Sequence, residues 1–253
     1  MDWMDDGIVL GSRKYGENNA IVTLFTRKHG RHLGIVHGGR RVRGIYQPGN
    51  LVSTRWRARL SEHLGTFVCE LNQSFAGTIL DDSLRLAALI SACAVANVTL
   101  PEREPHGAAY QGLLDFLGTL MTPNWLCTYV RWELLLLKEL GYGLDLAACA
   151  ATGSKENLLY VSPKSGRAVS ARAGAPYEDR LLPLPAFLLY DAPWDKNAIQ
   201  DGLRLTGYFL DRHAFTTRKE GEPSARSRFL GCVLEMATIS GIKGGNAEYG
   251  RRP

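Results

Sequence analysis

The first eighty residues alternate apolar and polar positions in short runs that glycines interrupt. A period of two predicts half-buried β-strands, because successive side chains of a strand point to opposite faces. Val22, Leu24 and Thr26 are expected to share one packed face and Leu33 and Ile35 another, with polar or basic neighbours pointing outward. The pattern predicts five strands, at residues 7–13, 20–26, 31–36, 51–60 and 65–71.

Five short strands in about eighty residues are what a small closed barrel requires. An OB-fold is a barrel of this kind, and it binds single strands of nucleic acid with one face and the adjoining loops. An SH3-like barrel is the structural rival. The sequence therefore predicts an N-terminal β-barrel over residues 1–80, with nucleic acid as its ligand.

The hydrophobic period changes after Leu80 to the helical spacing. Asp81 and Asp82 can cap the first helix, and Gly141 suits the left-handed position that follows the third. Helices are expected at residues 84–94, 109–121, 125–140, 197–212 and 225–238. They define a helical domain over residues 81–240, and the glycines beyond it predict a flexible tail at 241–253.

A loop-rich insert interrupts the helical pattern at residues 145–185. One strand is expected at 158–162, followed by a turn at 164–166, which predicts a β-hairpin. Cys149, Thr152, Ser170 and Ala173 have the spacing of a zinc ribbon, but one thiolate cannot hold structural zinc. We expect neither metal nor cofactor. The fold class is α+β: an OB-type barrel, then a mainly helical domain with an inserted zinc-ribbon-like hairpin that lacks the zinc ligands.

Composition limits the compartment and the chemistry. With 253 residues, 45% of them hydrophobic, the chain can build a sizeable core. No uncharged apolar run approaches the roughly 18 residues that a membrane span needs, and the acidic start does not resemble a secretory signal. A cytoplasmic protein is expected. The five scattered cysteines predict buried thiols rather than a disulfide framework.

Positive charge is concentrated at the start of the chain. Residues 1–80 hold eleven Lys and Arg against six Asp and Glu, while the remainder holds nineteen of each. No acidic residue occurs from Asn18 to Ser61, and so many like charges are hard to explain without a polyanionic partner. The candidate DNA contacts are Arg27, Lys28, Arg31, Arg40, Arg41, Arg43 and Arg57.

Aromatic and imidazole side chains accompany these charges. Bases can stack on aromatic rings, yet a small barrel needs large interior residues, so packing is the expected role of each ring. The rings are those of Tyr15, Phe25, Tyr46, Trp56 and Phe67. A metal site is not expected at the nearby imidazoles, because their basic surroundings repel a cation. These belong to His29, His32, His37 and His63.

No catalytic motif appears in the chain: it has no nucleophile elbow, Walker loop, HExxH, CxxC or dinucleotide-binding fingerprint. His37-Gly38-Gly39-Arg40 is best interpreted as a flexible basic turn. A hydrolase or nuclease would need carboxylates near the basic face, and the acid-free stretch supplies none. A non-enzymatic protein is therefore expected.

Several segments together resemble one bacterial family. They are GENNAIVTLFTRKHGR at 16–31, HGGRR at 37–41, RWELLLLKELGYG at 131–143, YVSPKSG at 160–166 and YFLDRHAF at 208–215. In this order and at these distances they resemble RecO proteins over about residues 7–228. The chain departs from the zinc-binding form of that family at Thr152, Ser170 and Ala173, and again after Ala225.

The resemblance implies a role in DNA repair and recombination. RecO proteins bind single- and double-stranded DNA, anneal complementary strands, contact the acidic tail of single-strand-binding protein, and with RecR load RecA onto coated strands. It implies DNA contact at the basic residues of 27–43, and it makes Arg131 the candidate for the partner's acidic tail, the rival being an ordinary surface arginine. An RNA-binding or ribosome-associated OB protein is the alternative function that the same charges permit.

Overall fold

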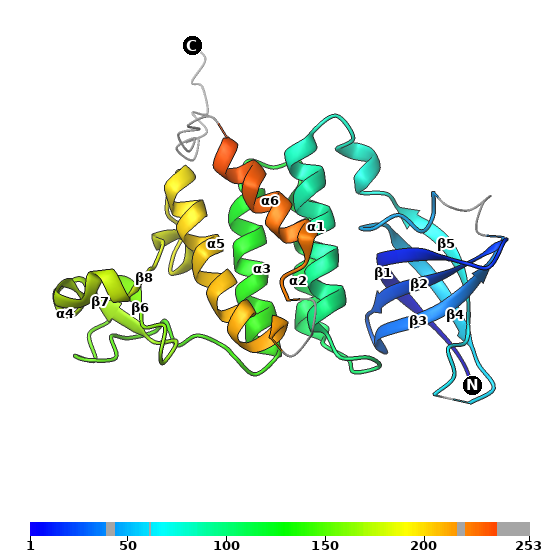
Figure 1. Ribbon diagram of the computed structural model, residues 1–253, viewed down its shortest axis with the longest axis horizontal. Helices are drawn as coiled ribbons and strands as arrows, with labels where there is room; N and C mark the ends of the chain where they lie inside the picture. Colours follow the sequence, from blue (N-terminus) through cyan, green and yellow to red (C-terminus); the bar gives the residue numbers. More distant parts are fainter. Residues whose placement is uncertain (39–43, 61, 217–220, 237–253) are drawn as a thin grey trace, which may run out of the picture.

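The computed structural model describes residues 1–38, 44–60, 62–216 and 221–236. A β-barrel forms one end of an elongated molecule, a bundle of helices lies in the middle, and a small three-stranded sheet forms the other end (Figure 1). The sequence-based expectation of an α+β protein is confirmed.

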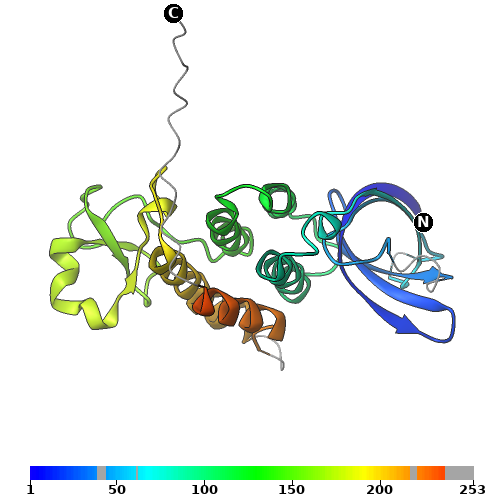
Figure 2. The same cartoon turned by 90° about the horizontal axis from the view of Figure 1, so that it is seen from above.

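Five strands close the barrel: β1 (Asp2–Tyr15), β2 (Asn19–Thr26), β3 (Gly30–His37), β4 (Leu51–Arg57) and β5 (Thr66–Gln73). They pair in the order β1-β2-β3-β5-β4, and β4 returns to β1. Every pairing is antiparallel except that of β3 with β5, which is a parallel contact at Ile35 and Thr66. Figure 2 shows the strands curving into a ring. This is the five-stranded barrel expected for an OB-fold.

Strands β1 and β2 are buried on both faces rather than on one. Val9, Val22 and Leu24 fill the barrel interior, whereas Ile8 and Phe25 point outward and join the core of the helical domain. The Phe25 ring meets that of Tyr110 edge-on, with 5.5 Å between centroids. The outer face of these strands is therefore an interface with the helices, which alternation alone did not predict.

The orientation predicted for β3 is wrong. Gly34 and Val36 face the interior with His32, while Leu33 and Ile35 are only partly buried. A Cβ atom on Gly34 would lie 2.5 Å from Cδ2 of Phe67, because that ring fills the space where a side chain would otherwise stand. A glycine and a histidine occupy positions that a hydrophobicity pattern assigns to the polar face.

The helical domain contains α1 (Ser83–Thr99), α2 (Gly107–Thr119), α3 (Trp125–Glu139), α5 (Lys196–Leu210) and α6 (Ser224–Glu235). All five helices were predicted, with ends that shift by a few residues. The Asp82 carboxylate caps α1 by accepting a hydrogen bond from the Arg85 amide at 2.9 Å, and Gly141 follows α3 with φ of 87°. A π-helical turn, η4 (Asp211–Phe215), extends α5.

Helix α6 is anchored by an ion pair in the middle of the domain. Nε of Arg226 lies 2.7 Å from Oε1 of Glu133 on α3, and both side chains are almost completely buried. Thr206 of α5 donates to the same carboxylate, and Glu222 pairs with the other side of the guanidinium at 2.5 Å. Hydropathy gives no indication of this contact, since both residues look like surface charges in the sequence.

The insert forms a hairpin from β6 (Leu158–Val161) and β7 (Ala168–Ser170), and the predicted turn at 164–166 joins them. A third strand, β8 (Leu182–Pro183), pairs with β6, after the short helices α4 (Ala171–Gly174) and η2 (Ala175–Arg180). Residues 145–185 with all these elements are called the hairpin module below, and its pieces are too short for a periodic signal. The five cysteines are free thiols, four of them buried. Among the described helices, none has the length and apolarity to cross a membrane.

Candidate nucleic-acid interface

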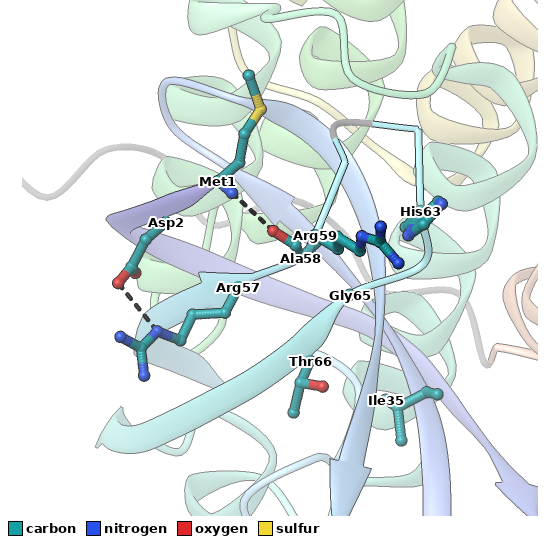
Figure 3. A pocket seen from close by; sticks show the side chains of 9 residues that line it. All are labelled: Met1, Asp2, Ile35, Arg57, Ala58, Arg59, His63, Gly65 and Thr66. Carbon is teal, nitrogen blue, oxygen red and sulfur yellow. Dashed lines mark hydrogen bonds and ion pairs between the residues drawn. The ribbon is translucent and has the colours of Figure 1, made fainter.

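A groove of about 770 Å³ opens at the rim of the barrel, beside the loop that joins β4 to β5. Arg57, Arg59 and His63 supply its basic side chains, and Ile35 and Thr66 line it where β3 meets β5. Figure 3 shows Arg59 and His63 on one side of the groove and Arg57 extending toward Asp2 on the other. In an OB-fold the β1–β2 and β4–β5 loops border the nucleic-acid site, so the groove lies where the fold predicts binding.

Strand alternation explains why the arginines of this groove are exposed. Trp56 points into the barrel and is 1% exposed, so its neighbours Arg55 and Arg57 point outward. Gly65 ends the loop with φ of 67°, and a Cβ there would lie 2.4 Å from the Trp56 ring. The backbone of the loop thus lies directly on a core indole, which fixes the position of the groove wall.

Asp2 pairs with the arginines of β4. The distance from Oδ2 of Asp2 to Nε of Arg57 is 2.9 Å, and Nε of Arg55 lies 2.9 Å from Oδ1. The hydrogen bond from Arg55 is the main cause that lowers the pKa of the Asp2 carboxyl to about 2; desolvation opposes it, and the hydrogen bond from Arg57 adds to the lowering. The stretch 18–61 lacks acidic residues in sequence, but in space a carboxylate from β1 lies beside it.

Arg27 and Lys28 belong to a second groove of about 480 Å³, on the outer face of β1, β4 and β5. This groove also contains Asp5, Asp6 and Glu70, and the Lys28 amide donates to Oδ2 of Asp5 at 2.7 Å. The expectation that no carboxylate lies near the basic face is therefore wrong here. The second groove therefore has mixed charge, whereas the groove at the barrel rim, called the rim groove below, is mainly basic.

Arg31 lies apart from the other candidates. Only 7% exposed, it donates from Nε to the Leu100 carbonyl at 2.8 Å and pairs with Glu102 at 3.3 Å. This guanidinium holds the end of α1 against the barrel, so Arg31 is not placed for a phosphate contact. Arg40, Arg41 and Arg43 lie outside the described residues.

Sequence reasoning missed two basic residues, Arg13 and Lys14. Both are exposed near the tip of the β1–β2 hairpin and line a groove of about 370 Å³ with Tyr46, Gln47 and Pro48. The signal was available, because they precede Gly16, whose φ of 64° marks the turn. They were overlooked because Glu17 separates them from the acid-free stretch.

The aromatic side chains mostly pack, as predicted. Phe25, Tyr46, Trp56 and Phe67 are at most 5% exposed, and Tyr15 alone of the predicted set is exposed, at 48%. Trp3, which the sequence did not single out, stacks on His29 with 4.0 Å between ring centroids.

The barrel histidines differ in their surroundings. Burial, and then the charges of Arg103 and His29, lowers the pKa of His32 to about 4. His29 donates from Nδ1 to Oδ2 of Asp5 at 3.0 Å, and His37 donates from Nδ1 to Oδ1 of Asn19 at the same distance. Within the described residues no group of three or more histidine, cysteine or acidic side chains is arranged to hold a metal ion.

Comparison with known families decides the membership of this chain. The family model for the recombination protein O N-terminal region matches residues 1–75, and the model for its C-terminal region matches residues 80–221. The chain belongs to the RecO family. The OB-fold barrel described above is the N-terminal domain of that family.

Curated RecO relatives align over nearly the whole chain. The DNA repair protein RecO of Rhodospirillum centenum is 51% identical over 246 residues, which cover 96% of this chain and 98% of that protein. The RecO of Mesorhizobium japonicum is 47% identical, covering 98% of this chain and all of the relative. That of Methylocella silvestris is also 47% identical, over 91% of this chain and 95% of the relative.

The hairpin of this RecO chain brings together three of its four zinc-ribbon positions. Cys149 Sγ accepts a hydrogen bond from the Ser170 amide at 3.2 Å. Burial tends to raise the pKa of this thiol, but hydrogen bonds from the side chains of Ser170 and Thr152 and from nearby amides lower it to about 6. Hydroxyls and amides thus surround the sulfur where further ligands would be needed for zinc.

Arg131 lies on the exposed side of α3. Its Nη2 and Nε donate to the Phe187 carbonyl at 2.7 and 3.2 Å, in the turn η3 (Ala186–Leu188). Glu133, the acidic residue two positions along α3, binds Arg226 and not Arg131. The guanidinium therefore already supports the fold, and it keeps an exposed face.

Proposed function

We propose that this RecO chain binds single- and double-stranded DNA along the rim of its barrel and acts as a mediator in DNA repair and recombination. The observation that supports this most directly is the rim groove, where Arg57, Arg59 and His63 face outward at the β4–β5 loop of an OB-fold. Arg13 and Lys14 extend the basic surface at the β1–β2 hairpin. Both loops are those through which OB-folds bind single strands.

The proposed binding is electrostatic. Each phosphate that an arginine neutralises releases condensed counterions, and this release supplies most of the sequence-independent affinity. Arg57 would exchange its bond to Asp2 for one to phosphate, and Arg59 would add a second contact. Arg27, Lys28, Arg40, Arg41 and Arg43 remain proposed contacts, whereas the burial of Arg31 removes it from the set.

Strand annealing follows from the same chemistry. Two complementary strands repel each other through their phosphates, and a protein that neutralises both lowers that repulsion. We propose a division of labour in which the barrel, residues 1–80, holds DNA and the helical domain, residues 81–240, holds partner proteins. No bond is made or broken in this role.

The proposed partners are single-strand-binding protein, RecR and, through them, RecA. An acidic peptide tail requires a cation beside an apolar surface. Arg131, exposed on α3, supplies the cation. A groove of about 260 Å³ between α5 and α6 combines both features, with Arg204 beside Leu203, Leu230, Val233 and Leu234. We therefore propose this groove as the second candidate for the acidic tail.

The first test is DNA binding as a function of salt, followed by the anisotropy of a labelled single-stranded oligonucleotide. Arg57→Ala combined with Arg59→Ala is expected to weaken binding about tenfold and to reduce the salt slope by about 1.4, which corresponds to two single-strand phosphate contacts. The control is Arg172→Ala combined with Arg180→Ala, which removes the same charge from exposed positions in the hairpin module.

The same series decides between functions. Equal effects of the two double variants would contradict the rim groove as the site. Tighter binding of structured RNA than of DNA would favour the RNA-binding alternative, and magnesium-dependent cleavage of the oligonucleotide would favour a nuclease. Wild-type acceleration of annealing between strands coated with single-strand-binding protein, lost on replacing Arg40, Arg41 and Arg43 by alanine, would support the mediator role.

A further inference from the structure

The loop that forms one wall of the rim groove is fixed through its carbonyl groups. Trp56 Nε1 donates to the Leu64 carbonyl at 3.2 Å, and the Ile35 amide donates to that of Gly65 at 2.9 Å. The two preceding carbonyls, of Glu62 and His63, accept from one side chain that does not belong to the barrel. Nη2 of Arg103 lies 3.0 and 3.1 Å from them.

Arg103 comes from the linker between α1 and α2, forty residues after the loop that it holds. Its backbone has φ of 62°, a left-handed conformation that is unfavourable for a residue with a side chain. Its amide donates to the Arg31 carbonyl at 2.9 Å. A glycine would adopt this backbone more easily, so the arginine at this position points to a use for its side chain.

The linker is itself held against the barrel by hydrogen bonds and close packing, which fixes the backbone position of Arg103. Arg31 bonds to the Leu100 carbonyl and to Glu102, on the two sides of Pro101. The β2–β3 turn lies directly on the linker, because a Cβ on Gly30 would come within 2.0 Å of the Glu104 carbonyl oxygen. Movement of the start of α2 would therefore be transmitted to the position of Arg103.

We infer that Arg103 is a positioning residue, through which the helical domain holds the β4–β5 loop in the conformation that binds nucleic acid. The inference rests on the proposed function, since it concerns the same groove. Arg59 and His63 are the basic loop residues that line the groove, and Arg103 holds the carbonyl of His63. Through the contacts of Arg103, a protein that binds the helical domain can change the conformation of the loop at the DNA site.

Arg103→Gly is the variant that tests the inference, because glycine suits φ of 62° and keeps the linker backbone while removing the guanidinium. Hydrogen exchange, followed by mass spectrometry in the absence of nucleic acid, is expected to quicken in residues 58–66 and to stay unchanged in α3. Affinity for a single-stranded oligonucleotide is expected to fall about fivefold. Arg180→Ala, an exposed arginine of the hairpin module, controls for the loss of charge and should change neither readout.

A double-variant comparison separates positioning from direct phosphate contact. If Arg103 acts through the loop, its substitution should cost less affinity in a His63→Ala background than in the wild type, because the residue whose carbonyl it holds has lost the side chain that lines the groove. Additive losses, or unchanged exchange in the loop, would overturn the inference. A wild type that binds no DNA would instead refute the proposed function, and the exchange experiment would still show whether Arg103 holds the loop.

Discussion

Gly34 determines how the barrel interior is filled. The Phe67 ring occupies the space beside it, with 2.5 Å between Cδ2 and the place where a Cβ would stand. The ring is 1% exposed, and its neighbours in the same core are Val36, Trp56 and Val22. The smallest and one of the largest residues of the barrel therefore form one packing unit.

Gly34→Ala is expected to destabilise the protein by about 1–3 kcal/mol, because the added methyl group must displace a ring in a closed interior. The free energy of unfolding in urea measures this. Gly11→Ala is the matched control within the barrel, since nothing lies within 4 Å of its Cβ position. Equal unfolding midpoints for the two variants would contradict this account of the interior.

The sequence could identify the basic residues but not sort them. Arg31 and Arg57 belong to the same acid-free stretch and look alike in it. One is buried against Leu100 and the other exposed at the groove, and the difference depends on contacts with residues about seventy positions away. Asp2 likewise reaches Arg55 and Arg57 only because β1 pairs with β4. Local charge patterns contain no such information.

At the scale of elements, helical periodicity located all five long helices, and Asp82 and Gly141 marked two of their boundaries. The short pieces α4, η2 and β8 of the hairpin module were not predicted, because two to six residues carry no measurable period. How the helices are fastened together was not predicted either. The ion pair of Glu133 and Arg226 joins α3 to α6, and it resembles two surface charges until the fold is known.

Arg226→Ala is expected to lower the free energy of unfolding by about 3–5 kcal/mol, because it leaves the Glu133 carboxylate buried without its partner. Arg228→Ala, an exposed arginine on the same helix, should stay within about 0.5 kcal/mol of the wild type. Urea denaturation followed by circular dichroism provides the comparison. A loss no larger than that of the control would show that α6 is not held by this pair.

At the scale of the whole molecule, the barrel and the helices share a core. The hydrophobic cluster of the helices includes three side chains that point outward from the barrel, those of Ile8, Leu10 and Phe25. The Phe25 ring contacts the ring of Tyr110 there. Sequence periodicity predicted two separate units, since it registers one buried face per strand. It had no means of showing that β1 and β2 are covered on the other face as well.

Residues 1–80 expressed alone are therefore expected to aggregate or to lack a cooperative unfolding transition, because the fragment exposes the apolar surface that the helices cover. The full chain should unfold in one transition. Size-exclusion chromatography and thermal circular dichroism of both proteins test this. A monomeric fragment with its own sharp transition would show that the barrel is independent of the helices.

The parallel contact between Ile35 of β3 and Thr66 of β5 also sets an order of events during synthesis. Chains emerge from the ribosome N-terminus first, and early segments can fold before later ones appear. The wall of the rim groove needs β5, and the guanidinium that holds its loop comes later still, at position 103. A nascent chain therefore exposes its basic β-strands before the rim groove is complete, and the finished groove appears only after the first helix has been made.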